Sequence, residues 1–165
     1  MTRRYFFWAG ASALALVLAN RLFGLQSASR AAETFEVSHS DAEWRALLTP
    51  AQYSVLRLQG TERPFSSPLD HEPRPGTFAC AGCELSLFSS KTKFDSRTGW
   101  PSFWQPLDGA VGTSDDTFLA MKRTEVHCHR CGGHLGHVFD DGPDGCDRYC
   151  INSVALRLEP NSTEG

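Results

Sequence analysis

Two Cys-x-x-Cys pairs constrain the fold of this 165-residue chain more than any other feature. The first pair is Cys80 and Cys83, and the second is Cys128 and Cys131. Each pair brings two sulfurs to one side of a tight turn, and two such turns facing each other complete a tetrahedral four-sulfur shell of the kind that holds structural Zn²⁺. The sequence therefore predicts one zinc ion that fastens together strands lying far apart along the chain, where loop closure is otherwise costly.

A disulfide framework is the alternative interpretation. The chain has six cysteines, and its first residues, described next, have the layout of an export signal. Exported proteins often form disulfides. A disulfide inside a Cys-x-x-Cys pair is usually redox-active rather than structural, and two such pairs in one structural framework would be unusual. We therefore predict zinc at the four paired cysteines.

Residues 1–31 have the three-part layout of an export signal. Arg3 and Arg4 precede an almost wholly apolar run over residues 5–18, and residues 29–31 supply a candidate cleavage site. The paired arginines followed by aromatic residues resemble a twin-arginine signal, which predicts export to the periplasm. An uncleaved membrane anchor facing the same compartment is the alternative, although a membrane helix needs about 20 apolar residues.

The remaining chain, residues 36–160, is long enough for one domain with its own core. Residues 1–31 carry arginines but no acidic residue, so the remainder is more acidic than the formal net charge of −3 of the whole chain. Such a charge offers no electrostatic surface for nucleic acid. We expect no nucleic-acid partner, and membrane contact only if the N-terminal segment is retained.

Two short helices are predicted at the start of this domain. Ser40 with Glu43, and Thr49 with Gln52, have the spacing of capping boxes, and Pro50 suits a first helical position. Apolar residues follow each cap at helical spacing: Trp44, Leu47 and Leu48, then Tyr53, Leu56 and Leu58.

Residues 59–76, which hold several prolines and glycines, predict a long ordered connection. Strand-forming residues then gather in short runs between turn residues. The predicted strands are residues 77–79, 84–88, 117–122 and 149–158. The predicted fold class is mainly β, with a short helical N-terminal arm.

Cys150 lies outside both pairs, in the last predicted strand. Because side chains alternate along a strand, Arg148, Cys150 and Asn152 should share one face. A nearby positive charge lowers the pKa of a thiol and makes it a nucleophile. Asn152 can donate a hydrogen bond to an anionic sulfur or to a polar substrate group. The alternative for Cys150 is a small buried hydrophobe without a chemical role.

Further candidate residues lie on either side of the second Cys-x-x-Cys pair. His134 and His137 lie three residues apart and Asp141 follows, so these side chains could move a proton or orient one another. Two such histidines could instead be structural, or ligands of a mixed metal site. Trp100 lies in the Gly- and Pro-containing segment 99–104 and could form a wall for an apolar substrate group.

Seven segments, in this order, resemble the methionine-R-sulfoxide reductases, the MsrB family. The resemblance covers residues 40–158 and implies two antiparallel β-sheets with a helical arm and a Cys₄ zinc site. The segments are Thr61-Glu-Arg-Pro-Phe65, Cys80-x-x-Cys83, Gly99-Trp-Pro-Ser-Phe103, Cys128-x-x-Cys131, His134-Leu-Gly-His-Val-Phe139, Asp141-Gly-Pro143 and Arg148-Tyr-Cys-Ile-Asn-Ser153.

The resemblance also implies a role for each candidate residue. Cys150 is similar to the catalytic nucleophile, which attacks the sulfur of methionine-R-sulfoxide, free or in proteins and peptides, and becomes a sulfenic acid. Trp100 is similar to the tryptophan that packs against the sulfoxide methyl group. The polar set that activates the thiol and handles the oxygen corresponds to His134, His137, Asp141, Arg148 and Asn152.

The chain departs from the family at the thiol that reduces the sulfenic acid. Many members have a resolving cysteine where this chain has Thr98. Either Cys146 resolves Cys150, or a thioredoxin-like dithiol attacks Cys150 directly. An extended strand would hold Cys146 and Cys150 about 13 Å apart, and a disulfide needs their Cα atoms within about 7 Å. The intervening residues 142–145 contain two glycines and a proline, so a turn is plausible.

Two other functional classes stay open at this point. One is a zinc-ribbon binding module, which predicts neither a reactive thiol nor turnover. The other is a related thiol oxidoreductase that acts on a different oxidised substrate.

Overall fold

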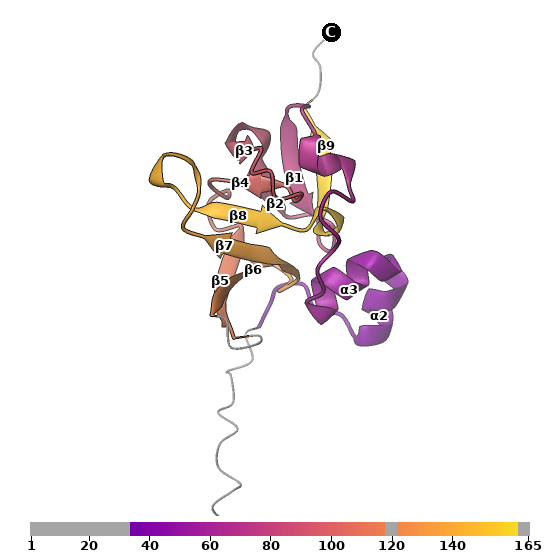
Figure 1. Ribbon diagram of the computed structural model, residues 1–165. Coiled ribbons are helices and arrows are strands. Elements are labelled where there is room, and N and C mark those ends of the chain that lie inside the picture. Colours follow the sequence, from indigo (N-terminus) through magenta and orange to yellow (C-terminus); the bar gives the residue numbers. More distant parts are fainter. Residues whose placement is uncertain (1–33, 118–121, 162–165) are drawn as a thin grey trace, which may run out of the picture. The chain divides into compact units, whose positions relative to one another are not determined.

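A computed structural model describes residues 34–117 and 122–161. They form two antiparallel sheets with two short helices at the start, which confirms the predicted mainly β fold class (Figure 1). The predicted export segment, residues 1–31, lies outside the described residues. Within the described ranges no helix is both long and apolar enough to cross a bilayer.

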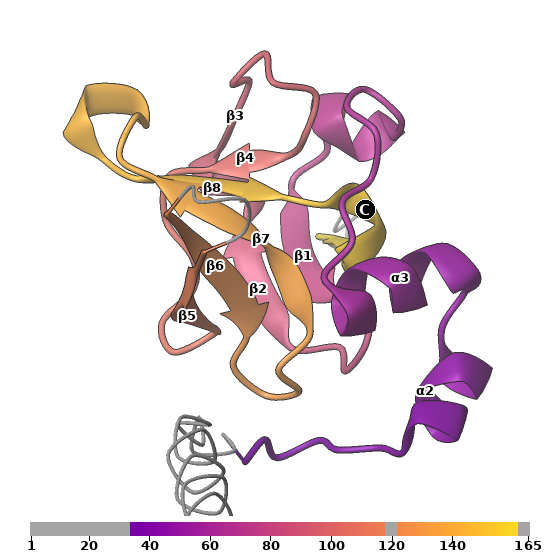
Figure 2. The ribbon, with the colours of Figure 1, turned by 60° about the horizontal axis from the view of Figure 1, so that its bottom comes forward.

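The helices α2 (Asp41–Leu47) and α3 (Pro50–Leu58) begin at the predicted caps. Both capping boxes are present. Each N-cap hydroxyl accepts a hydrogen bond from the backbone N–H three residues on, and the side chain at N3 accepts one from the backbone N–H of the N-cap residue. The apolar stripe is narrower than predicted, since Leu47 and Leu58 are 62% and 61% exposed. Figure 2 shows α3 beside β7 and the turn before β9.

The smaller sheet has three strands in the order β2-β1-β9. Its central strand is β1 (Gly76–Cys80), which pairs with β2 (Ser86–Ser89) and β9 (Leu156–Pro160). The predicted strand at residues 84–88 begins two residues late, because Glu84 turns the chain with a left-handed φ of 62°.

The larger sheet has six strands in the order β3-β4-β8-β7-β6-β5. This order places β8 and β7 in the middle of the sheet. The short strands β3 and β4 flank them on one side, and the β5–β6 hairpin flanks them on the other. The strands are β3 (Lys93–Phe94), β4 (Ser102–Phe103), β5 (Val111–Asp116), β6 (Arg123–Cys128), β7 (His134–Phe139) and β8 (Arg148–Ile151).

Two strand predictions need correction. Residues 149–158 form two strands in different sheets, because the 3₁₀ turn η5 (Ser153–Ala155) separates β8 from β9 and carries the chain across. In the predicted strand at 117–122, Thr117 and Lys122 are not in a strand and residues 118–121 lie outside the described ranges. The neighbouring strands β5 and β6 were not predicted. In β5 the residues on both faces are mostly polar, so the alternation typical of a half-buried strand is missing.

Aromatic rings hold the two sheets together. Phe78 and Phe88 are cross-strand partners in the smaller sheet, and both lie against Phe103 of β4, at centroid distances of 5.0 and 4.4 Å. All three are fully buried. The connection 59–76 contains the 3₁₀ turn η1 (Pro68–His71), in which Leu69 packs against the core.

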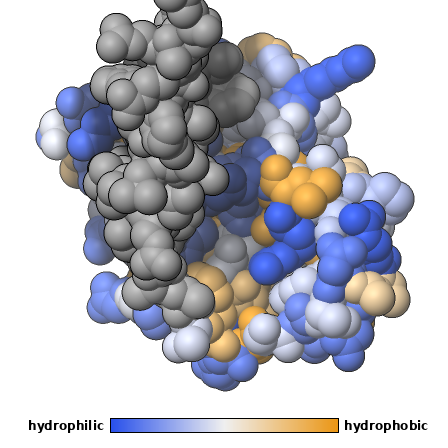
Figure 3. Space-filling view, turned by 90° about the horizontal axis from the view of Figure 1, so that it is seen from below, coloured by the Kyte–Doolittle hydropathy of each residue, from blue (hydrophilic) through white to orange (hydrophobic). Residues whose placement is uncertain are grey.

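On the coloured part of the face shown in Figure 3, hydrophilic residues predominate and apolar residues gather in small patches. The large apolar side chains exposed in the described part are Leu47, Leu58, Phe65 and Phe139. Single exposed apolar residues are normal in soluble domains. Phe139 differs from the others because it also lines the pocket described next.

Candidate active site

A row of reactive and polar side chains crosses one face of the larger sheet. Ser102, Cys150, His137, Glu125 and Ser114 are successive cross-strand partners from β4 through β8, β7 and β6 to β5. Cross-strand partners project from the same face, with Cβ atoms about 5 Å apart. Strand pairing therefore places Cys150 between a serine and a histidine that lie far away in sequence.

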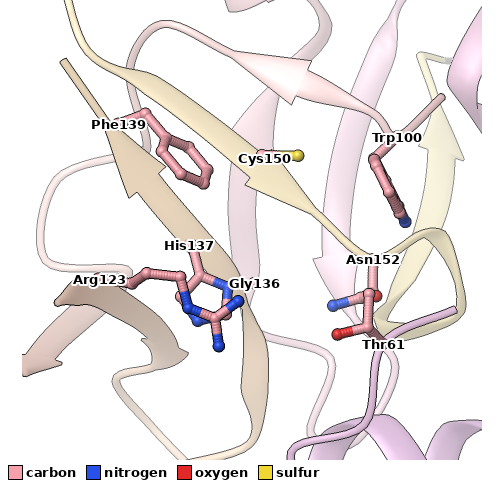
Figure 4. Close-up of a pocket in the computed structure, with 8 residues that line it drawn as sticks. All are labelled: Thr61, Trp100, Arg123, Gly136, His137, Phe139, Cys150 and Asn152. Carbon is pink, nitrogen blue, oxygen red and sulfur yellow. The ribbon is translucent and has the colours of Figure 1, made fainter. Parts of the chain in front are cut away.

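Cys150 opens into a pocket on this face. Figure 4 shows its sulfur pointing toward the side of the pocket formed by Trp100. Four predicted site residues meet here, namely Trp100, His137, Cys150 and Asn152. The full lining is Thr61, Trp100, Arg123, Gly136, His137, Phe139, Cys150 and Asn152.

Gly136 lines this pocket at a point where β7 and β8 lie close together. A Cβ at this position would lie 2.0 Å from the carbonyl oxygen of Cys150, which no side chain can tolerate. The glycine therefore permits β7 and β8 to approach each other directly beside the thiol.

Arg148 and Asp141 form an ion pair beside Phe139, which lines the pocket. The guanidinium donates to both carboxylate oxygens of Asp141, at 2.8 and 3.0 Å, and stacks over the ring of Phe139 at 4.4 Å. Arg148 lies on the same strand face as Cys150, as predicted. Asp141 is exposed and does not line the pocket, but its negative charge also raises the pKa of the Cys150 thiol.

Burial dominates the ionisation of Cys150. It raises the pKa of the thiol, whereas the Thr98 hydroxyl and the positive charge of Arg148 lower that pKa by less. The net pKa lies above its ordinary value, contrary to the expectation of a depressed one. Arg148 acts in the predicted direction, but Asp141 offsets part of its charge.

His137 is a neutral imidazole at neutral pH, because burial lowers its pKa. Its Nε2 lies 2.8 Å from Asp116 Oδ2, which also accepts a hydrogen bond of 2.7 Å from Arg123. A carboxylate only accepts, so Nε2 carries the proton and Nδ1 is the basic nitrogen. Asp116 and Arg123 were absent from the predicted site, and only the β5–β6 pairing brings them to it.

His134 is set apart from the other predicted residues. It is buried behind His137, with ring centroids 5.4 Å apart, and does not line the pocket. Its Nδ1 lies 2.8 Å from Glu125, and this contact holds the pKa of Glu125 at about 2. Glu125 also accepts hydrogen bonds from Gln59 and Ser114. No pattern in the sequence predicted the pairing of His134 with Glu125.

Glu62 organises the opposite wall of the pocket. Its backbone N–H donates to Asn152 Oδ1 at 3.0 Å, and its carbonyl accepts from Trp100 Nε1 at 3.3 Å. Its carboxylate accepts from the backbone N–H groups of Ser153 and Val154. The segment of residues 61–65 was noted in the sequence, but its link to both Trp100 and Asn152 depends on the tertiary fold.

Asn152 is engaged at both ends of its amide. Besides accepting from Glu62, it donates through Nδ2 to the carbonyl of Leu135 at 2.9 Å. One further amide hydrogen is left for a ligand in the pocket.

The two residues relevant to recycling lie in different surroundings. Cys146 is exposed in the β7–β8 loop, where its N–H donates to Pro143 and its carbonyl accepts from Gly142. Thr98 lies beside the candidate nucleophile, with its hydroxyl oxygen 4.0 Å from the sulfur of Cys150.

The four paired cysteines meet in one cluster, whose sulfurs all lie within 4.8 Å of one another. The Cys80–Cys131 and Cys83–Cys128 sulfur distances are 3.8 and 3.5 Å. A tetrahedral zinc with Zn–S bonds of about 2.3 Å would hold its sulfurs about 3.8 Å apart, and disulfide sulfurs lie about 2.05 Å apart. All six cysteines are free, so the cluster fits a metal shell and not a disulfide framework.

The pocket places a strand thiol beside a histidine and an aromatic wall, and four further cysteines form a cluster elsewhere in the fold. Together these features define a cysteine-dependent enzyme. Residues 48–160 match the family described as the SelR domain. Curated relatives are similar over most of both chains and carry the name peptide methionine sulfoxide reductase MsrB. The chain therefore belongs to the MsrB family of peptide methionine sulfoxide reductases.

Three relatives show the extent of the similarity. A protein of Bradyrhizobium diazoefficiens is 54% identical over 76% of this chain and 91% of its own length. One of Pseudomonas entomophila is 57% identical over 72% of this chain and 92% of its own. One of Methanosarcina mazei is 52% identical over 79% of this chain and 94% of its own. Of the functional classes left open by the sequence, the family selects the reductase.

Proposed function

We propose that this chain catalyses the thiol-dependent reduction of methionine-R-sulfoxide to methionine, with Cys150 as the nucleophile. The observation that carries the proposal is the position of Cys150, which opens into a pocket between His137 and the wall formed by Trp100. The substrate is methionine-R-sulfoxide in oxidised proteins or peptides, or the free amino acid, so the enzyme repairs oxidative damage.

In the first half-reaction His137 takes the thiol proton on Nδ1, the nitrogen that faces away from Asp116. The Cys150 thiolate attacks the sulfoxide sulfur, and the same proton passes to the sulfoxide oxygen. The attack forms a transient S–S bond, which breaks as the oxygen moves from the substrate sulfur to the sulfur of Cys150, so methionine leaves and Cys150 becomes a sulfenic acid. The thiol is oxidised by two electrons and the substrate is reduced by two.

Charged groups in the pocket stabilise the oxygen as it gains negative charge. Arg123 lines the pocket and Arg148 lies on the face of Cys150, and fixed cations of this kind are effective where water is excluded. Asn152 has one amide hydrogen to offer. His134 acts indirectly, by fixing the ring of His137 from behind.

Trp100 and Phe139 supply the apolar part of the binding site. Trp100 packs against the methyl group of the substrate, held by its hydrogen bond to Glu62. A sulfoxide whose methyl and oxygen are exchanged would place oxygen against this wall. The arrangement therefore favours one epimer.

We propose direct recycling by an external dithiol of the thioredoxin type. One thiol attacks the sulfenic sulfur and releases water, and the second thiol then displaces Cys150, which leaves reduced enzyme and a disulfide in the donor. Two loop hydrogen bonds hold Cys146, and resolution by Cys146 would require that loop to rearrange. Resolution by Cys146 is the alternative and is tested below.

We propose that the four-cysteine cluster holds one Zn²⁺ through Cys80, Cys83, Cys128 and Cys131. A closed thiolate shell leaves no open coordination position, so the metal would serve the fold and not the reaction. It would join the turn after β1 to the β6–β7 hairpin, and so one sheet to the other.

The location of the enzyme is proposed from the sequence. Residues 1–31 would direct export to the periplasm by a twin-arginine signal. Fractionation of cells that produce the full chain should find it in the periplasm, and the double variant Arg3→Lys with Arg4→Lys should stay in the cytoplasm. The mass of the exported protein would separate a cleaved signal from a retained anchor.

The activity is tested with a methionyl-sulfoxide peptide of each epimer and a dithiol reductant. Reduction of the R epimer alone is expected, and the Cys150→Ser protein should leave both epimers unreduced. Equal rates for the two epimers, or turnover by Cys150→Ser, would refute the proposal.

A further inference from the structure

Three hydroxyl groups form a chain that ends at the sulfur of Cys150. Ser102 Oγ donates to the carbonyl of Trp100 at 3.1 Å and lies 2.7 Å from Ser96 Oγ. Ser96 Oγ lies 2.8 Å from Thr98 Oγ1, and Thr98 Oγ1 lies 4.0 Å from Cys150 Sγ. Ser102 is fully buried and is the cross-strand partner of Cys150.

The carbonyl at the far end sets the direction of every bond in the chain. A carbonyl can only accept, so Ser102 gives its single proton to Trp100 and must accept from Ser96. Ser96 has then spent its proton and accepts from Thr98. Thr98 in turn accepts, so the thiol of Cys150 is the donor at the near end. In this direction the chain suits a neutral thiol.

A thiolate needs the opposite direction, because it has no proton to give. Thr98 would turn its hydroxyl to the sulfur, Ser96 would donate to Thr98, and Ser102 would donate to Ser96 and leave the Trp100 carbonyl. We propose that Ser102, Ser96 and Thr98 are a reorienting hydroxyl chain that stabilises the ionised form of Cys150. This inference rests on the proposed role of Cys150 as nucleophile.

The chain can turn but cannot carry the proton away. A proton passed along it would stop at the carbonyl of Trp100, which has no way to pass it on. The proton of Cys150 must leave on the other side, where His137 is the cross-strand partner. Cys150 therefore has a base on one flank and a reversible donor on the other, and Thr98 and Ser96 are positioning residues that act on the charge of the sulfur.

The same reorientation links the thiol to the substrate wall. Trp100 supplies both the terminal carbonyl and the ring that lines the pocket. Its carbonyl has a donor while Cys150 is protonated and loses that donor when Cys150 ionises.

The test measures the ionisation of Cys150 without any sulfoxide. Full-length reduced protein is treated with iodoacetamide across a pH series, and modification of Cys150 is followed by peptide mass spectrometry. Thr98→Val keeps the shape of the side chain but removes the donor. It should move the midpoint to higher pH and slow modification at neutral pH by roughly two- to tenfold, the range for one lost hydrogen bond of ordinary strength, because the oxygen–sulfur contact is long at 4.0 Å. Thr98→Ser should restore the wild-type profile.

Ser96→Ala separates a chain from a single contact. Ser96 does not touch Cys150, so only a connected chain predicts a shift in the same direction, smaller than that of Thr98→Val. A wild-type midpoint in either Thr98→Val or Ser96→Ala would overturn the proposal, provided that metal content and thermal unfolding match those of the wild type. If the wild-type protein shows the expected ionisation profile but does not reduce methionine sulfoxide, the result counts against the proposed function alone.

Discussion

Cys150 and His137 are direct partners across β8 and β7, so the candidate nucleophile has a neutral imidazole as its cross-strand neighbour. A neutral base beside a buried thiol differs from the thiolate–imidazolium pair of a preionised site. The resting thiol keeps its proton, because burial raises its pKa more than Arg148 and Thr98 lower it.

Replacement of Arg148 should change the pH profile. Arg148→Met removes the positive charge that lowers the pKa of Cys150, so the rise of kcat/KM with pH should move to still higher pH. The direction follows because a higher thiol pKa leaves less thiolate at any given pH. Arg157→Met is the matched control, since Arg157 is exposed on β9 and pairs with Glu84 and Glu159. A shift of equal size in both variants would contradict this prediction.

The raised pKa of Cys150 also makes a small contribution to the pH dependence of stability. The folded state holds this proton more tightly than the unfolded state does. The contribution is therefore complete below the unfolded pKa and is lost as pH rises through the folded one. The free energy of unfolding should fall on the alkaline side less steeply in Cys150→Ser than in the wild type, as measured by urea titration at several pH values.

Removal of the nucleophile should separate chemistry from folding. Cys150→Ser should lose reduction of the R epimer, because the hydroxyl is a far weaker nucleophile than the thiolate, while its melting temperature and metal content stay close to those of the wild type. Activity assays, calorimetry and metal analysis check the three properties together. An unfolded or metal-free Cys150→Ser protein would show that the residue has a structural role instead.

Removal of a proposed metal ligand should do the opposite. Cys80→Ser leaves three sulfurs in the cluster, so the protein should lose its zinc and its cooperative unfolding transition. Cys146→Ser is the control, because Cys146 is an exposed thiol outside the cluster. Stable folding of Cys80→Ser without metal would refute a structural zinc.

Trp100→Ala should act mainly on substrate binding. Loss of the apolar wall should weaken binding by roughly 1–3 kcal/mol, seen as a higher KM. Trp100→Phe keeps a ring and loses only the hydrogen bond to Glu62, so its KM should lie closer to that of the wild type. An unchanged KM in Trp100→Ala would place the methyl group elsewhere.

Thiol counting decides how Cys150 is recycled. With one equivalent of substrate and no reductant, direct recycling predicts that Cys150 becomes a sulfenic acid while Cys146 stays free. Cys146→Ser should then turn over with thioredoxin at the wild-type rate. A Cys146–Cys150 disulfide in peptide maps, together with stalled turnover of Cys146→Ser, would establish Cys146 as the resolving thiol.

Local signals in the sequence predicted the helices and the four-cysteine cluster. The capping boxes at Ser40 and Thr49 specify helix starts within four residues, and each Cys-x-x-Cys pair specifies a turn. These signals are complete within a short segment, so no tertiary contact is needed to interpret them. The prediction that Leu47 and Leu58 belong to a buried apolar stripe was wrong, because the exposure of a helical residue depends on what packs against the helix.

The sequence did not predict which strands pair in the larger sheet, or in which register. Asp116, Arg123 and Glu125 reach His137 or its neighbour His134 only because β5 and β6 take their particular register. The split between β8 and β9 has a similar cause, since Ser153 and Val154 turn toward the carboxylate of Glu62, far away in sequence. Residue patterns show which side of a strand is polar, but not which strand lies next to it.

The four-cysteine cluster has a cost for a protein that works among oxidants. Cys80, Cys128 and Cys131 are buried, whereas Cys83 is partly exposed. Thiolates are oxidised according to their exposure, so damage to the shell should begin at Cys83. Loss of the metal would release the β6–β7 hairpin, which carries Arg123, Glu125, His134 and His137. The working lifetime of the repair enzyme would then be set at Cys83, which lies outside the pocket of the thiol that is meant to be oxidised.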